Sequence, residues 1–139
     1  MIKDCNVGIK ALLIVEGKCL IVKRVEPTHE YWDVPGGRID DNETLMETLA
    51  RELGEELPSL KNYTVENIVG AYRFRKNITN DRGLVLIFYK VIAPSFDVVL
   101  SEEHTEYIWV GKNELPKFYE EGFPIEPDLR KMVEKVLEK

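Results

Sequence analysis

The sequence predicts an α+β domain with mixed strands and two helices, arranged as an α/β/α sandwich. Two observations carry this prediction. The 139 residues are 44% apolar and 32% charged, which is a globular composition with room for one core. Several β-rich runs surround two stretches in which apolar residues recur at helical spacing. We therefore expect residues 1–139 to form a single domain.

Charge and hydropathy exclude several classes of protein. Apolar runs such as Ala11–Val15 are far shorter than the roughly 18–20 residues of a membrane span. The start, "MIKDCNVGIK", carries charges where a signal peptide needs apolar residues. We expect no membrane partner and a cytoplasmic location. A net charge of −6 leaves no electrostatic footprint for polymeric nucleic acid. Cys5 and Cys19 fit no zinc spacing, so we expect free, reduced thiols.

The N-terminal part predicts a hairpin followed by a long loop. Two β-rich runs, Val7–Val15 and Lys18–Val25, are separated by the short polar step Glu16-Gly17. The proline and glycine content of Glu26–Asn42 predicts a loop. We expect a short extended piece within it, around Tyr31–Val34.

The first helix has a clear beginning and end in the sequence. The stretch from Thr44 to Glu47 has the S/T-x-x-E form of a capping box, so the helix is predicted to begin near Thr44. Pro58 is expected to end it. The apolar stripe predicted from helical spacing comprises Leu45, Met46, Leu49, Ala50, Leu53 and Leu57.

The C-terminal part predicts three further strands and a closing helix. Val65–Lys76 and Leu84–Ala93 are β-rich and joined through "NITNDRG", which suggests a second hairpin, and Glu106–Val110 is a shorter strand. Pro127 suits a first helical turn. The apolar residues at helical spacing after it are Leu129, Met132, Val133 and Val136.

Three glutamates of the first helix gather on one arc. At about 100° per residue, Glu56 lies roughly 40° to one side of Glu52 and Glu55 roughly 60° to the other. Unpaired carboxylates at this spacing repel one another, whereas a divalent cation that prefers oxygen ligands, Mg²⁺ or Mn²⁺, would bind them. The alternative is an ordinary solvated helix face.

The residues upstream favour the metal site. "WDVPGG" ends in two glycines, where the backbone can approach a metal or a phosphate without a Cβ in the way. Arg51 has the wrong sign for a metal ligand. It can instead pair with Glu43 and so hold the loop against the helix.

At these residues the sequence resembles the Nudix hydrolases, whose signature is G-x5-E-x7-R-E-U-x-E-E-x-G-U, with U a bulky aliphatic residue. The spacing of Gly37, Glu43 and the segment 51–57 reproduces it. Pro58 and Ser59 depart from the last two positions, beyond the carboxylates. The resemblance implies a Nudix-like α/β/α sandwich with a mixed β-sheet between helices.

The resemblance also implies an activity, a cofactor and a set of ligands. It implies Mg²⁺-dependent hydrolysis of a nucleoside diphosphate linked to another group, with Mn²⁺ able to substitute. The substrate would be a small-molecule nucleotide, and a homodimer is compatible with the family. By motif matching, the ligands would be Glu52, Glu55, Glu56 and the Gly36 carbonyl.

A late stretch, "SEEHTEYIWV", is expected to complete the site, because family members often use a residue from the loop before the late strand. Glu102, Glu103 and His104 are candidates for an extra metal ligand or a general base, and a histidine suits the second role. A polar surface loop is the alternative. Cations that could meet phosphates, or could equally be solvated charges, are Arg38, Arg24 and Lys23.

The favoured substrate is a nucleoside triphosphate, canonical or oxidised, cleaved to monophosphate and pyrophosphate. One alternative is a GDP-mannose-type nucleotide-sugar hydrolase, which "PGGRI" and "EEHTEYIW" resemble. A second is a nucleotide-binding domain without catalysis. A third is the isomerase branch of the fold, for which Cys5 and Cys19 lack the supporting motif.

Overall fold

The sheet and its flanking helices are seen in a computed structural model that describes residues 5–27, 30–40, 42–74, 83–102, 104–116 and 125–138. The strands are β1 (Cys5–Val15), β2 (Lys18–Val25), β3 (Glu30–Asp33), β4 (Gly36–Arg38), β5 (Thr64–Phe74), β6 (Gly83–Ile92) and β7 (His104–Val110). The helices are α1 (Leu45–Glu56), the short 3₁₀ turn η1 (Lys112–Glu114) and α3 (Pro127–Val136).

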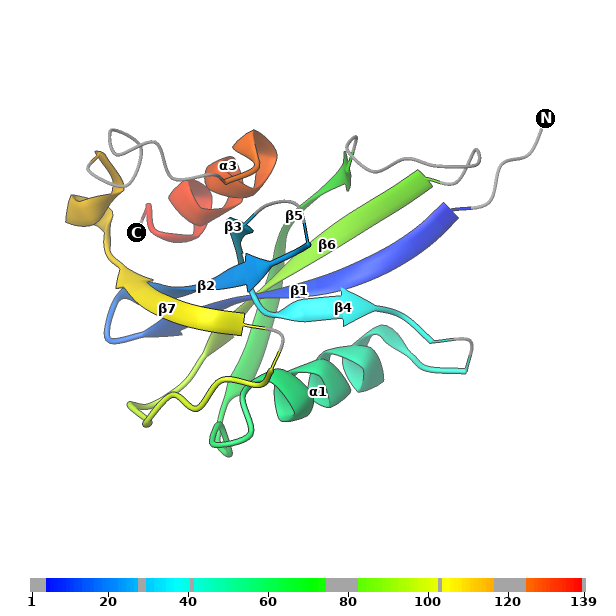
Figure 1. The fold of residues 1–139 in the computed structure, drawn as a ribbon, viewed down its shortest axis with the longest axis horizontal. Helices are drawn as coiled ribbons and strands as arrows, with labels where there is room; N and C mark the ends of the chain where they lie inside the picture. The colour runs from blue at the N-terminus through cyan, green and yellow to red at the C-terminus, as the bar shows by residue number, and fades with distance from the viewer. Residues whose placement is uncertain are drawn as a thin grey trace.

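Strand β1 organises the sheet (Figure 1). The strand order is β3-β2-β1-β6-β5, with β4 added on β1 and β7 on β2. One edge of β1 pairs in parallel with β6, from Cys5 to Ile14. The other edge changes partner along its length, because β4 pairs with the segment 8–10 and β2 with the segment 14–15. Between these two paired segments, the Ala11 amide of β1 donates to the Pro35 carbonyl of the segment that links β3 to β4 (residues 33–35).

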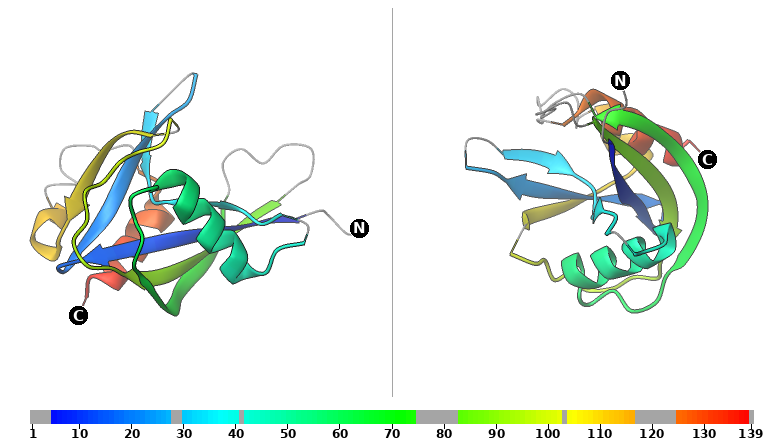
Figure 2. Two further views of the ribbon diagram at one scale, coloured as in Figure 1. Left: turned by 90° about the horizontal axis from the view of Figure 1, so that it is seen from below. Right: turned by 90° about the vertical axis from the view of Figure 1, so that its right-hand side faces the viewer.

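The two faces of the sheet are covered by different helices, so the chain forms three layers (Figure 2). Side chains of β1 alternate between the faces, as strand geometry requires. Both faces of β1 are buried, which explains its continuous apolar run. The α1 face contains Ile9, Ala11, Leu13, Leu49, Leu53 and Leu57. The α3 face contains Leu12, Ile21, Phe88, Leu129, Val133 and Val136. The predicted α+β sandwich with a mixed sheet is confirmed.

Helix α1 begins at the predicted capping box. The Thr44 side chain accepts a hydrogen bond from the Glu47 amide at 3.1 Å, and the Glu47 carboxylate accepts one from the Thr44 amide at 2.8 Å. Leu57 caps the other end, immediately before Pro58. The predicted stripe was wrong for Met46 and Ala50, which are exposed.

The reason is that the buried arc of α1 is rotated away from Met46 and Ala50. It includes Thr48 and Glu56 instead, both of which are buried with the leucines. Because an apolar stripe assigns faces from hydropathy alone, it cannot anticipate a buried glutamate. The rotation is what carries the Glu56 carboxyl inward.

Several strands differ from their predicted extent, and β1 begins at Cys5 rather than at Val7. The segment 36–38, predicted as loop, forms β4 because its backbone pairs with β1, and glycines offer no side-chain pattern from which to predict that. The late strand begins at His104 rather than Glu106. Strands β5 and β6 are antiparallel, as a hairpin requires, although most of "NITNDRG" lies outside the described residues. Within the described ranges, no helix is long and apolar enough to cross a membrane.

Candidate metal and hydrolysis site

The paired glycines place backbone directly against the carboxylates of α1. Gly36 has a φ of 148°, a backbone conformation that residues with a Cβ rarely adopt. A Cβ on Gly36 would overlap the Ile9 carbonyl, and a Cβ on Gly37 would overlap the Glu52 carboxyl group. Both positions therefore need glycine for the close approach.

Glu52, Glu55 and Glu56, the glutamates of the signature motif and here called the box glutamates, differ sharply in burial. The Glu55 side chain is 60% exposed, that of Glu52 is 12% exposed, and that of Glu56 is only 2% exposed. Glu56 Oε2 accepts a hydrogen bond from the Gly36 amide at 3.2 Å. The three carboxylates thus extend from solvent at Glu55 to the interior at Glu56, which is held by the Gly36 amide.

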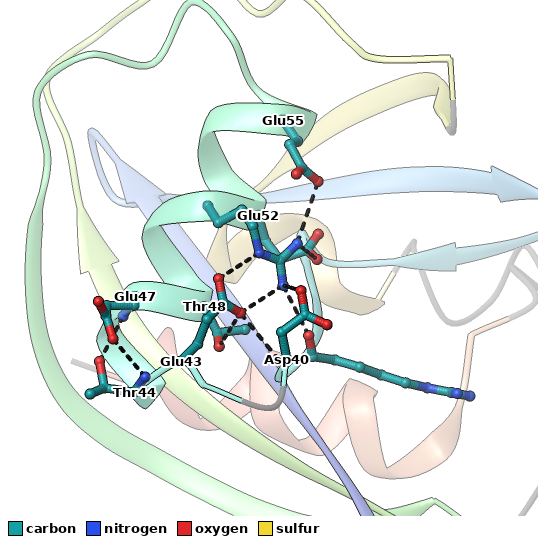
Figure 3. Close-up of polar contacts among 9 residues, drawn as sticks. Asp40, Glu43, Thr44, Glu47, Thr48, Glu52 and Glu55 are labelled. Carbon is teal, nitrogen blue, oxygen red and sulfur yellow. Dashed lines mark hydrogen bonds and ion pairs between the residues drawn. The ribbon is translucent and has the colours of Figure 1, made fainter.

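Arg51 is the cation that Glu43, Glu52 and Glu55, labelled in Figure 3, contact. Its guanidinium donates to both oxygens of Glu43, at 2.8 and 3.0 Å. It also donates to Glu52 at 2.8 Å and lies 3.6 Å from Glu55. Hydrogen bonding from Arg51 lowers the pKa of Glu43 to about 2. Arg51 therefore fastens the loop to the helix, as predicted, and compensates the charge of two box glutamates.

Glu56 also meets the residue that begins β7. His104 Nε2 lies 3.6 Å from Glu56 Oε1, and both side chains are 2% exposed. Burial raises the pKa of Glu56 well above its ordinary value, and the neighbouring Glu52 carboxyl raises it further. The positive charge of Lys10 acts in the opposite direction. A cation near Glu56 would favour its ionised form.

The donor set suits a hard divalent cation. Glu56 Oε1 is buried and has no hydrogen bond of regular geometry among the described residues. Carboxylates and a backbone carbonyl are the oxygen ligands that Mg²⁺ and Mn²⁺ prefer. In the part of the chain that the structure describes, no three carboxylate, imidazole or thiol groups are already arranged around a common point. Glu52 and Glu55 are instead paired with Arg51, at 2.8 and 3.6 Å.

The other predicted residues lie in different surroundings. Lys23 forms ion pairs with Glu30 at 2.8 Å and with Glu106 at 3.0 Å. Arg24 lies 3.4 Å from Glu26, and Arg38 is exposed at the end of β4.

The late candidates are separated by the structure as well. Glu102 is exposed in the turn before β7, whereas His104 is buried in the site. Glu103 lies outside the described residues. Among the described residues of the late stretch, His104 is the candidate that lies against a box glutamate.

Sequence analysis missed Lys10 and Asp33. Lys10 lies on β1 and is buried, with its ammonium 3.0 Å from the Asp33 carboxylate and 3.3 Å from the Val34 carbonyl. The available signal was a lone lysine within the apolar run "GIKALLIV". A lysine in a strand buried on both faces needs a partner.

Comparison with known proteins gives a consistent assignment. The family model described as the NUDIX domain matches residues 6–135. The "Low-salt glycan biosynthesis protein Agl8" of Haloferax volcanii is 30% identical over 101 residues, 72% of this chain but only 62% of that protein. The "8-oxo-dGTP diphosphatase" of Buchnera aphidicola subsp. Schizaphis graminum is 28% identical over 129 residues, 88% of this chain and 91% of that protein.

Solved structures show the same architecture. The MutT protein from Methanosarcina mazei Go1 superposes with a TM-score of 0.77 at 26% identity, covering 97% of this chain and 94% of that one. The E. coli ORF135 protein has a TM-score of 0.74 at 23% identity, covering 97% and 90%. At that lower identity the likeness concerns the fold alone.

Proposed function

The chain belongs to the Nudix hydrolase family and is a pyrophosphohydrolase, and from that premise we propose that it converts a nucleoside triphosphate, canonical or oxidised, to monophosphate and pyrophosphate. Nudix hydrolases act on small nucleotides and generally use divalent metals. The proposed metal here is Mg²⁺, with Mn²⁺ able to replace it. A homodimer and a cytoplasmic location stay predictions.

One observation carries the proposal. A buried glutamate, Glu56, is fixed by the Gly36 amide with one oxygen left without a regular hydrogen bond. Glu52 and Glu55 lie beside it on the same helix. We propose that these three carboxylates and the Gly36 carbonyl hold the metal. When bound there, such a metal would polarise phosphoryl oxygens, lower the pKa of its bound water and neutralise charge on the leaving phosphate.

The residues of the chain have separate tasks in this proposal. Water attacks phosphorus, a P–O bond forms, the anhydride P–O bond breaks, and a proton must leave the water. His104 is the proposed proton acceptor, and its Nε2 at 3.6 Å from Glu56 Oε1 supports that role. Arg51 compensates the box charge, and Arg38 is the proposed contact for an outer phosphate. Glu102 stays a predicted ligand.

The relative named 8-oxo-dGTP diphosphatase supports a triphosphate substrate, since it matches 88% of this chain. A nucleotide-sugar hydrolase is the second candidate. The contact of His104 with Glu56 favours this candidate, because GDP-mannose-type hydrolases, which this stretch resembles, have a histidine at this place. A relative whose name refers to glycan biosynthesis agrees with it.

Phosphorus NMR of reactions with dGTP, 8-oxo-dGTP and GDP-mannose, with Mg²⁺ or with EDTA, tests the proposal. The expected products from a triphosphate are monophosphate and pyrophosphate, formed only with the metal. Formation of GDP and mannose would assign the nucleotide-sugar alternative. Binding of nucleotides without turnover of any of them would contradict hydrolysis.

A further inference from the structure

Lys10 is a charged residue in the centre of the sheet, where a charge is costly. Its side chain is 9% exposed, and β1 is buried on both sides of it along the chain. Burying an ammonium group is tolerated only when the charge is paired and hydrogen-bonded. The position therefore calls for a role that an apolar residue could not perform.

The contacts of Lys10 converge on one short segment, the link from β3 to β4. The ammonium donates to Asp33 at 3.0 Å and to the Val34 carbonyl at 3.3 Å. The next residue of β1, Ala11, donates its amide to the Pro35 carbonyl at 2.8 Å. Residues 33–35 are thus tied to β1 by both side-chain and backbone hydrogen bonds.

The stem of Lys10 also reaches Gly36, the first residue of β4. Lys10 and Gly36 are register partners in the β1–β4 pair. A Cβ on Gly36 would lie 2.7 Å from Lys10 Cδ, so the aliphatic stem packs directly over the glycine. Gly36 in turn donates its amide to the buried Glu56 carboxylate. An unbroken chain of contacts runs from the ammonium of Lys10 to the deepest box glutamate.

We propose that Lys10 is a positioning residue, whose buried ammonium anchors the link at Asp33 and Val34 and so fixes the Gly36 backbone against Glu56. The inference rests on the proposed function, since Gly36 and Glu56 are its metal ligands. The hydrogen bonds that the ammonium makes to described residues go to the protein's own link, which favours positioning over direct contact with the nucleotide.

Lys10→Met tests this, because methionine keeps most of the stem and removes the charge. Lys18→Met is the matched control, since Lys18 lies in the same sheet but its ion pair with Glu114 is exposed. Mn²⁺ affinity, measured by electron paramagnetic resonance without substrate, reports the ligand set. Loss of a residue that orients ligands typically weakens metal binding by about 10–100-fold. That loss is expected for Lys10→Met, with Lys18→Met within about twofold of the wild type.

Two further readouts separate positioning from other roles. The hydrogen-exchange rate of the Gly36 amide, measured by NMR, should be higher in Lys10→Met than in the wild type. In Lys18→Met the rate should be unchanged. The KM for the nucleotide at saturating metal should stay near the wild-type value. A raised KM with unchanged Mn²⁺ affinity would overturn the proposal and make Lys10 a substrate contact.

The double variant Lys10→Met/Asp33→Asn covers the case in which the single variant fails to fold, because the half-buried side chain at position 33 then carries no charge that has lost its cation. Weak Mn²⁺ binding in the folded double variant supports positioning, and wild-type binding would overturn it. Failure of the proposed function looks different. A wild type that binds Mn²⁺ but hydrolyses no nucleotide would refute hydrolysis, while the Gly36 amide would still test the role of Lys10.

Discussion

Gly37 lies directly against the carboxyl group of Glu52, with no room between them for a side chain. The two residues come from different elements, β4 and α1. Their contact is a close approach of backbone to a proposed metal ligand, and it depends on the absence of a Cβ.

Gly37→Ala should therefore displace Glu52 while leaving the fold intact, because the group that must move is the end of a flexible side chain. We expect the Mg²⁺ concentration needed for half of maximal activity to rise by at least about tenfold, by analogy with the loss of ligand-orienting groups. A metal titration of the rate of pyrophosphate release measures it.

Gly54→Ala is the matched control within the same signature motif, in the segment 51–57. Gly54 is helical, and a Cβ there would meet nothing within 4 Å. Alanine in a helix interior should stabilise the protein by about 0.5–1 kcal/mol, measured by urea unfolding, with an unchanged metal requirement. Equal metal requirements in both variants would contradict the importance of the Gly37 contact.

Glu56→Gln should lower kcat by at least about 10²-fold, because it removes one ligand charge from the metal site. The wild type should also gain thermal stability on titration with Mg²⁺, and Glu56→Gln should gain less. Steady-state rates and melting temperatures with Mg²⁺ or EDTA measure both effects.

Glu66→Gln provides the comparison for Glu56→Gln. Glu66 is exposed on β5, 3.7 Å from Lys90 and away from the box. Its variant should keep wild-type rates. If Glu56→Gln hydrolyses the best substrate as fast as this control, Glu56 is not a ligand.

His104→Gln should lower kcat by about 10²–10⁴-fold, the range expected for loss of a general base. Glutamine can still donate toward Glu56 but cannot accept a proton. Glu102→Gln should have little effect on kcat because Glu102 is exposed, unless it supplies a ligand. If Glu102 is a ligand, Glu102→Gln would instead raise the Mg²⁺ concentration needed for half of maximal activity. Rates and metal titrations of the two variants decide between these roles.

The Glu43 and Arg51 pair predicts a pH dependence of stability. The folded-state pKa of Glu43 is lowered to about 2 from an ordinary value near 4.3. A carboxyl with a lowered pKa stabilises the fold above its unfolded pKa, and the stabilisation is lost as pH falls through the folded value. Glu43→Gln should lower the melting temperature at pH 7.

The difference in melting temperature between wild type and Glu43→Gln should shrink as pH falls from about 4.5 toward 2. Melting curves over that range measure it, with Glu66→Gln as the control. A difference that is constant over the whole range would show that the hydrogen bonds to Glu43 contribute independently of its charge.

Local sequence signals predicted most of the secondary structure. The capping box at Thr44 placed the start of α1 correctly, and the Glu16-Gly17 step placed the first hairpin. Both signals depend on a few neighbouring residues, which is why one sequence is enough to recognise them.

What the sequence could not predict depends on contacts between distant residues. The strand β4 exists because its glycines pair with β1, and His104 was predicted as a candidate without its contact to Glu56. Lys10 escaped notice because its partners, Asp33 and Val34, come from a link that approaches it only after the sheet has formed.

The parallel pairing of β1 with β6 has a consequence for the order of folding. Strand β1 pairs along most of its length with β6, residues 83–92. A large loop must therefore close before the centre of the sheet can form. During synthesis, α1 and its glutamates are made well before that partner. Until β6 arrives, β1 presents an unpaired apolar edge to solvent, the state in which a nascent chain is most prone to aggregate.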